Sequence, residues 1–203
     1  MSWQLVSQGP SQYFAFTAGA HNALYSTKQG QDDLIETLEP VLLKQTHSSV
    51  IIDIDSPGER TGDGLISRRG QCIGVKIADC LPVYLFTQKT ICIIHCGWRG
   101  ITAGIARRAK DLLRRYRYVL GASIGPCCYE VEEDVAARFA AHYPGAVTIR
   151  ESRYYLDLKS AVTADLGSRN LLGTLDLCTK CHPGYFYSHR RGDDGRNYAL
   201  ITA

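Results

Sequence analysis

Three short apolar runs in the middle of the chain constrain its fold more than any other feature of the sequence. Residues 72–78 (CIGVKIA), 81–86 (LPVYLF) and 90–95 (TICIIH) follow one another with only a few residues between them. Apolar runs of this length between turn signals are typical of buried strands. We therefore predict three strands here, with no helix separating one from the next.

Helical periodicity begins only after these runs. Apolar residues between positions 101 and 116 recur at spacings of four, four, three and four, which predicts an amphipathic helix. Further helices are predicted over residues 131–143 and 156–172, a loop over 57–64, and further strands over 49–54, 118–124, 185–187 and 198–201. Because strands and helices do not alternate regularly, we predict an α+β fold rather than a simple doubly wound sheet.

Size and composition indicate one globular domain over residues 1–203. The chain is 45% hydrophobic, and its charged residues make up 21% of the total, with both signs interspersed. A chain of this length can bury a sizeable core. The net charge of +3 suits a small anionic substrate and is too low to indicate nucleic-acid binding.

Neither a signal peptide nor a membrane span is expected. The opening residues, MSWQLVSQGPSQYF, lack a basic start followed by an apolar run, and no apolar stretch approaches the roughly 20 residues of a spanning helix. Eight cysteines in such a chain are expected to be reduced, metal-bound or catalytic rather than paired in disulfides. We therefore expect a cytoplasmic protein.

Three side chains that can bind a metal lie at the ends of predicted strands. His47 precedes one strand, Cys80 follows another, and His95 ends a third. Two imidazoles and a thiolate would leave one open position on a tetrahedral zinc ion. Spacing alone leaves two alternatives open. The histidines could be hydrogen-bonded structural residues, or the site could be a metal-free cysteine hydrolase with Cys80 as nucleophile and His95 as base.

Two further cysteine pairs lie in the second half of the chain. Cys127 and Cys128 are adjacent, and we expect them in a tight loop facing the active site. Residues 178–182 read CTKCH, the haem c attachment pattern. Haem is not expected, because there is no export signal and the first residue is the only methionine. The CxxC pair could be redox-active or half of a structural site, and buried packing is the role we expect.

Five segments together resemble one protein family. They read KQTHSS, ADCLPVYLF, IIHCGWRGITAGI, SIGPCCYEV and, near the end, CTKC with FYSHRRGDDGRN. In this order they resemble the laccase-domain family, which is also called the multicopper polyphenol oxidoreductase or purine nucleoside phosphorylase family. The GWRG turn that follows the D-C-x-P segment is the most specific of these matches.

The resemblance implies a zinc ion bound by His47, Cys80 and His95, which would also be the catalytic residues. It implies phosphorolysis of adenosine, inosine, guanosine and methylthioadenosine, with adenosine deamination at the same site and no organic cofactor. It also implies a layered α/β/β/α sandwich with mixed sheets, similar to toxin-type cysteine hydrolases. Zinc is expected rather than copper, because a copper site of this type usually adds an axial methionine and six histidines are too few for a multicopper oxidase.

Three arginines in the matched segments are predicted to bind substrate, with phosphate as their target. Arg99 opens a predicted helix, and Arg190 and Arg196 lie in the C-terminal loop. We expect all three to converge on the metal site, because a phosphate dianion must meet several donors when it leaves water. Nucleoside and phosphate would then be the partners of this chain, without nucleic acid or membrane.

One segment departs from the family pattern and keeps other functions open. Relatives usually carry T-x-R-x-G-G-V-S near the N-terminus, whereas residues 17–23 read TAGAHNA, with no arginine and with His21 as a candidate substitute. The missing arginine motivates a catalytically silent nucleoside-binding protein. Some bacterial relatives also suggest an amidase that edits serine-containing muropeptide precursors with the same three residues.

Overall fold

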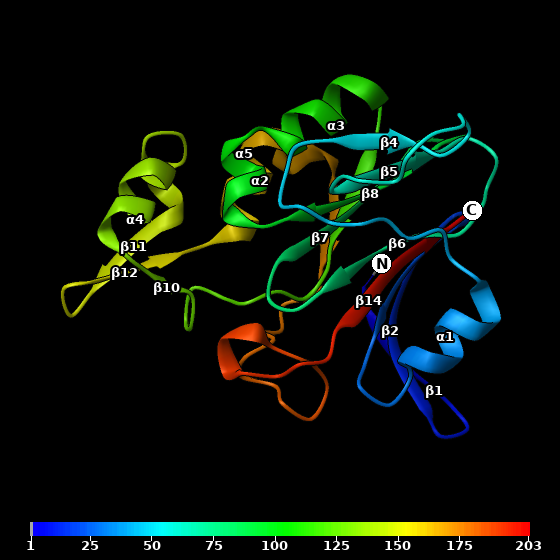
Figure 1. Cartoon of the computed structure of the whole chain (residues 1–203), viewed down its shortest axis with the longest axis horizontal. Helices are drawn as coiled ribbons and strands as arrows, with labels where there is room; N and C mark the ends of the chain where they lie inside the picture. Colours follow the sequence, from blue (N-terminus) through cyan, green and yellow to red (C-terminus); the bar gives the residue numbers. More distant parts are fainter. Residues whose placement is uncertain (1) are drawn as a thin grey trace.

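The structure is a computed structural model that describes residues 2–203, and in these residues three sheets are flanked by helices (Figure 1). The six-stranded sheet has the order β13 (Leu171–Thr174), β9 (Arg117–Leu120), β7 (Leu81–Phe86), β8 (Ile91–Cys96), β5 (Gly64–Ser67) and β4 (Ile51–Asp53). The five-stranded sheet has the order β1 (Gln4–Gln8), β2 (Ser11–Ala18), β3 (His21–Ser26), β14 (Asn197–Thr202) and β6 (Ile73–Ile77). A small sheet has the order β10 (Glu130–Val131), β12 (Arg153–Leu156) and β11 (Val147–Arg150).

The three predicted central strands all form, and they divide between the two larger sheets. The run at 81–86 is β7, and the run at 90–95 falls in β8, which pairs antiparallel with β7. The run at 72–78 contains β6, which lies beside β14 in the other sheet. Every residue of β7 and β8 is buried, which explains why these runs are continuously apolar rather than alternating.

Side chains of β7 point alternately into two cores. Val83 and Leu85 lie in the core that helices α2 (Trp98–Thr102), α3 (Ile105–Leu113) and α5 (Leu158–Leu166) cover. Tyr84 lies in the second core, between the two larger sheets. Helix α1 (Gln31–Leu38) packs against β2, and α4 (Glu133–Ala140) packs against the small sheet at one end of the molecule (Figure 1). The predicted layered α+β fold is therefore confirmed.

All three predicted helices are shorter than expected, and glycine breaks or ends two of them. The helix predicted over 101–116 is broken at Gly104, whose φ of 84° is left-handed, a conformation that favours glycine and ends a helix. The helix predicted over 156–172 forms only as α5. Asp157 caps its start by accepting the N–H of Ser160 at 3.0 Å, and Gly167, with φ 82°, ends it before β13.

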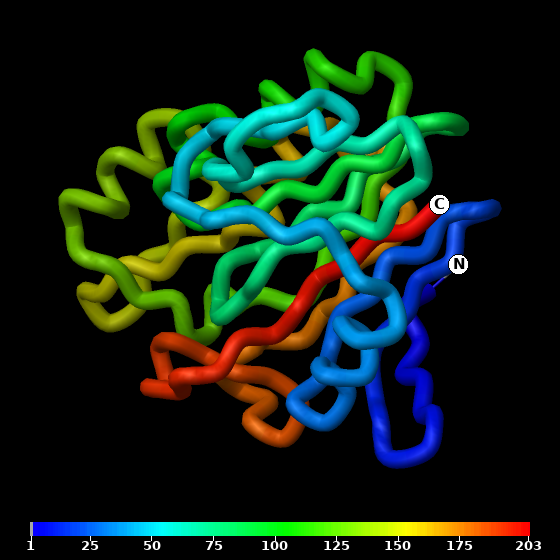
Figure 2. Tube along the Cα trace, turned by 45° about the vertical axis from the view of Figure 1, so that its right-hand side comes forward, coloured from blue at the N-terminus to red at the C-terminus, as the bar shows by residue number. Residues whose placement is uncertain are grey.

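The ends of the chain contain the larger errors. The strand predicted over 185–187 is wrong, because the N–H groups of Tyr185 and Phe186 donate to the carbonyl of His182 and form a turn. Strands β1 to β3 were not predicted, and β1 is largely exposed, which removes the apolar alternation of a half-buried strand. The strand predicted over 198–201 is confirmed as part of β14, which runs between β3 and β6 (Figure 2).

No helix among the described residues combines the length and the apolar character that a membrane crossing needs.

Candidate active site

A buried carboxylate that the sequence analysis missed organises the candidate site. Asp63 is fully buried and lies just before β5. It accepts hydrogen bonds from the N–H groups of Thr46 at 3.2 Å, His47 at 3.0 Å and Ser48 at 2.5 Å. These bonds hold the backbone of the 46–48 loop around one side chain. They also fix His47, whose φ of 58° is left-handed, in a conformation that is uncommon for a residue other than glycine.

The same carboxylate orients His95 at the end of β8. The Nδ1 atom of His95 lies 2.8 Å from Oδ1 of Asp63, and the His95 N–H donates to the Asp63 carbonyl at 2.7 Å. Burial alone would raise the pKa of Asp63, but its bonds to His95 and Ser48 hold that pKa well below the usual 3.8. An ionised carboxylate can only accept, so Nδ1 carries the proton and Nε2 is the atom left for another partner.

Cys80 lies at the end of the β6–β7 turn, next to these histidines. The atoms of His47, Cys80 and His95 that could bind a metal all lie within 4.8 Å of one another. Burial would raise the pKa of the Cys80 thiol, but the charge of His95 and hydrogen bonds from both imidazoles lower it to about 6. Burial would lower the pKa of His95, but Cys80 and Asp63 raise it to about 9. The site therefore favours a thiolate at neutral pH.

Gly97 leaves space beside this thiolate. A Cβ atom built on Gly97 would lie 2.9 Å from Cys80 Sγ, closer than real Cβ contacts allow, and 3.2 Å from His47 Cδ2, which is also tight. Any larger residue at position 97 would therefore push into the ligand cluster. Residue 97 begins the G-W-R-G turn, so the motif has a steric role as well as starting α2.

The cluster opens into a cavity of about 730 Å³, a volume typical of small-molecule sites. Arg99, Arg190 and Arg196 all line this cavity together with the three ligand residues, as do Trp98 and Tyr129. The expected convergence of the arginines on one space is therefore seen. The guanidiniums nevertheless differ in what they contact within the protein.

Arg190 is the most firmly placed of the three arginines. Its N–H donates to Asp79 Oδ2 at 2.7 Å, and its Nη1 donates to the Glu130 carbonyl at 2.7 Å. Asp79 also accepts a bond from the Thr179 hydroxyl at 2.6 Å, so it joins the two C-terminal loops to the turn that contains Cys80. By contrast, Arg196 Nη1 donates to carbonyls of its own loop, at 2.9 Å and 2.8 Å. The Arg99 guanidinium lies 4.8 Å from the centre of the Trp98 ring.

His21 does not lie at this site. It is buried, its Nε2 donates to the Thr87 carbonyl at 2.7 Å, and its ring packs against Phe86 with centroids 5.1 Å apart. It lines a different cavity. His21 therefore does not contribute to the cavity that His47, Cys80 and His95 line.

Comparison with known proteins identifies the family. Residues 6–203 match the family described as multi-copper polyphenol oxidoreductase laccase, and the chain belongs to this family. It is 29% identical to a purine nucleoside phosphorylase of Clostridium acetobutylicum, over 94% of this chain and 91% of that protein. It is 30% identical to the purine nucleoside phosphorylase LACC1 of Mus musculus over 77% of this chain, but that match spans only 40% of the mouse protein.

A solved structure shows the same fold. YlmD from Geobacillus stearothermophilus superposes with a TM-score of 0.83 over 98% of both chains, at 22% sequence identity. The layered arrangement of sheets and helices is therefore shared with this protein, whereas the chemistry of the site has to be argued from the residues of this chain.

Proposed function

We propose that this chain is a purine nucleoside phosphorylase that also deaminates adenosine. The observation that carries the proposal is the placement of His47, Cys80 and His95 at one wall of a cavity that three arginines also line. Relatives that align over most of the chain bear the name purine nucleoside phosphorylase. The cavity has the size for a nucleoside, and its cations suit phosphate.

We infer that His47, Cys80 and His95 bind zinc. The donor set of two imidazoles and one thiolate suits this ion, and two features of the site favour its binding. The bond to Asp63 occupies Nδ1 of His95, so Nε2 is the atom that would bind the ion once it gives up its proton, and the lowered pKa of Cys80 supplies a thiolate. When bound, the ion would supply a Lewis acid with one open position for an oxygen ligand.

In the proposed phosphorolysis, a phosphate oxygen forms a bond to C1′ of the ribose as the bond from C1′ to the purine nitrogen breaks. The electron pair of the broken bond leaves with the base, which takes up a proton. In deamination, water adds to C6 of adenosine and ammonia leaves. Arg99, Arg190 and Arg196 would hold the phosphate in the first reaction and have no phosphate to hold in the second.

The lowered pKa of Cys80 supports a second candidate, a metal-free cysteine hydrolase. A thiolate beside His95, itself oriented by Asp63, is the arrangement of an activated nucleophile and its base. In this alternative, Cys80 would attack a carbonyl carbon. If metal-free protein is fully active and loses that activity on alkylation by iodoacetamide, the result would support the cysteine hydrolase over the phosphorylase.

The test is incubation of the purified protein with adenosine, with and without phosphate. Adenine and ribose 1-phosphate formed only with phosphate, together with inosine in either case, are the expected products. Cys80→Ser should abolish both, whereas Cys72→Ser, which changes a cysteine outside the cavity, should abolish neither. Product from a serine-containing muropeptide alone would identify an amidase. Tight nucleoside binding without turnover would identify a silent binding protein.

A further inference from the structure

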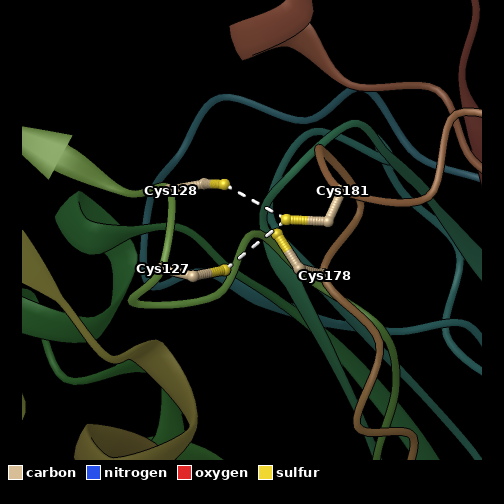
Figure 3. Close-up of side chains that lie close together, drawn as sticks. All are labelled: Cys127, Cys128, Cys178 and Cys181. Atoms are coloured by element: carbon tan, nitrogen blue, oxygen red, sulfur yellow. Dashed lines mark hydrogen bonds between the residues drawn. The ribbon is translucent and has the colours of Figure 1, made fainter.

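Four cysteines that the proposed reaction does not use meet at one point of the surface. Cys127 and Cys128 lie in the turn after β9, and Cys178 and Cys181 lie in the loop after β13. Their sulfur atoms all lie within 4.8 Å of one another, and in Figure 3 the four side chains point toward a common centre. The buried packing expected for the CxxC pair is wrong, because Cys181 is exposed and Cys178 is only half-buried.

The sulfur spacing matches a metal tetrathiolate. Cys128 and Cys181 have their sulfurs 3.3 Å apart, and Cys127 and Cys181 have theirs 3.7 Å apart. Four sulfurs that each lie about 2.3 Å from a central zinc ion, at the corners of a tetrahedron, are about 3.8 Å from one another. All four thiols are free, so no covalent bond accounts for their approach.

Main-chain hydrogen bonds around the cluster fix the positions of the four sulfur atoms. The N–H of Gly125 donates to Cys178 Sγ at 3.2 Å, the type of outer contact that orients a metal-bound thiolate. The N–H of Cys128 donates back to the Gly125 carbonyl at 2.9 Å, which closes the turn. The N–H of Thr179 donates to the Ser123 carbonyl at 3.1 Å, so the two loops are already joined beside the sulfurs.

We propose that Cys127, Cys128, Cys178 and Cys181 bind one structural zinc ion. Four protein thiolates complete a tetrahedral coordination shell and leave no position for substrate, which is typical of a structural rather than a catalytic site. The pair of cysteines on each loop makes the ion a cross-link between two segments that are about fifty residues apart in the sequence.

The cross-link would stabilise one wall of the active-site cavity. Tyr129, which lines that cavity, directly follows Cys128. Thr179, between the two cysteines of the other loop, donates to Asp79 beside Cys80. Arg191 Nη1 donates to the carbonyls of Thr179 and Lys180, both at 3.0 Å. The ion would therefore be joined to the catalytic pocket through hydrogen-bonded loops without contacting substrate.

Metal analysis of protein purified without oxygen and without a metal-affinity tag tests the proposal. Wild-type protein should contain about two zinc ions per chain, and both Cys80→Ser and Cys181→Ser should contain about one. Cys72→Ser is the matched control and should keep both. Because Cys181→Ser could fail to fold, X-ray absorption of zinc in Cys80→Ser gives an independent measurement, with four sulfur neighbours at about 2.3 Å expected.

Each result separates this site from the one in the proposed function. One zinc in wild-type protein that disappears in Cys80→Ser would overturn the four-cysteine site and leave the first site intact. Loss of zinc only in Cys181→Ser would support the four-cysteine site and overturn the first. Iron or copper at the cluster would overturn its assignment to zinc. So would a disulfide among the four cysteines, detected by mass spectrometry of alkylated, unreduced protein.

Discussion

Cys80 and Cys181 belong to two candidate ligand clusters that this fold builds in different ways. The cluster of Cys80 has three candidate ligands and opens into a cavity. Of these, His95 is buried and His47 is exposed. The cluster of Cys181 has four thiols, none of them fully buried. In the first cluster a buried carboxylate orients the ligands, whereas in the second a main-chain N–H does so.

This difference shows how one residue type can take two roles in one chain. A cluster of three protein ligands leaves a coordination position for chemistry, and its imidazoles are oriented by hydrogen-bond acceptors on their other nitrogens. A cluster of four thiols leaves no such position and needs only loops that approach closely. If the comparison holds, changes in the first cluster should reduce turnover much more than changes in the second.

The largest loss of turnover is expected for Cys80→Ser. Changes in the partners that orient metal ligands typically cost about 10–100-fold in affinity or activity, and loss of a ligand itself should exceed that range. We therefore expect phosphorolysis to fall by more than about 100-fold, measured as adenine release with phosphate present. Activity within tenfold of wild type would contradict a role for Cys80 in the reaction and remove the contrast between the clusters.

Asp63→Asn should have the next largest effect. An asparagine amide would direct N–H groups at donors such as the N–H of His47 and would no longer hold the proton of His95 on Nδ1. We expect metal affinity to fall by about 10–100-fold, measured by competition with a chelator. We also expect a loss of about 3 kcal/mol in the free energy of unfolding, because buried donors lose an ionised acceptor.

The pH dependence of this stability loss follows from the lowered pKa of Asp63. A carboxylate with a lowered folded-state pKa contributes stability that is fully present above its ordinary value of 3.8 and is lost as the pH falls further. The difference in unfolding free energy between wild type and Asp63→Asn should therefore shrink as the pH falls below about 4, whereas a change near neutral pH reflects His95, whose pKa Asp63 also raises. Denaturant titrations at several pH values measure it, and a difference independent of pH would contradict an ionised Asp63.

Asp63 also marks the limit of what the sequence predicts about the site. The three candidate ligands stand at strand ends and within recognisable segments, so the sequence alone singles them out. Asp63 reaches His95 only because β5 pairs with β8, a long-range contact that local patterns do not contain. The one local signal is its place between Gly62 and Gly64, where added Cβ atoms would collide with Val50 and Ile94.

The fold shows the same division between local and long-range information. The runs that became β7 and β8 are buried on both faces, so they are uniformly apolar and easy to recognise. Strand β1 is stabilised by its pairing with β2 and buries little of its own surface. The meeting of Cys128 with Cys181 depends on the parallel pairing of β9 and β13, and the helix predicted over residues 156–172 extends into the first two residues of β13.

Arg196→Ala should weaken phosphate binding and leave deamination nearly intact. A charge-assisted contact is worth about 1.5–3 kcal/mol, which corresponds to about one to two decades in binding. We expect the phosphate concentration needed for half-maximal phosphorolysis to rise by that factor. Lys89→Ala, which removes one exposed positive charge outside the cavity, is the control. Equal loss of both reactions would mean that Arg196 binds the nucleoside or supports the fold.

Cys181→Ser should have the smallest effect on turnover and a clear effect on stability, and this combination tests the comparison most directly. The four-cysteine cluster lies outside the cavity lining, and it acts on the pocket only through loop contacts such as the bond from Thr179 to Asp79. We expect turnover at saturating substrate to fall by less than about tenfold, below the range for partners that orient a catalytic metal ligand. Loss of a bound ion at about 100 times its dissociation constant should lower the free energy of unfolding by about 2.7 kcal/mol. Added zinc should restore the stability of wild type stripped of metal but not that of Cys181→Ser. A loss of turnover as large as that of Cys80→Ser, in protein that remains folded, would show that the two clusters act as one site.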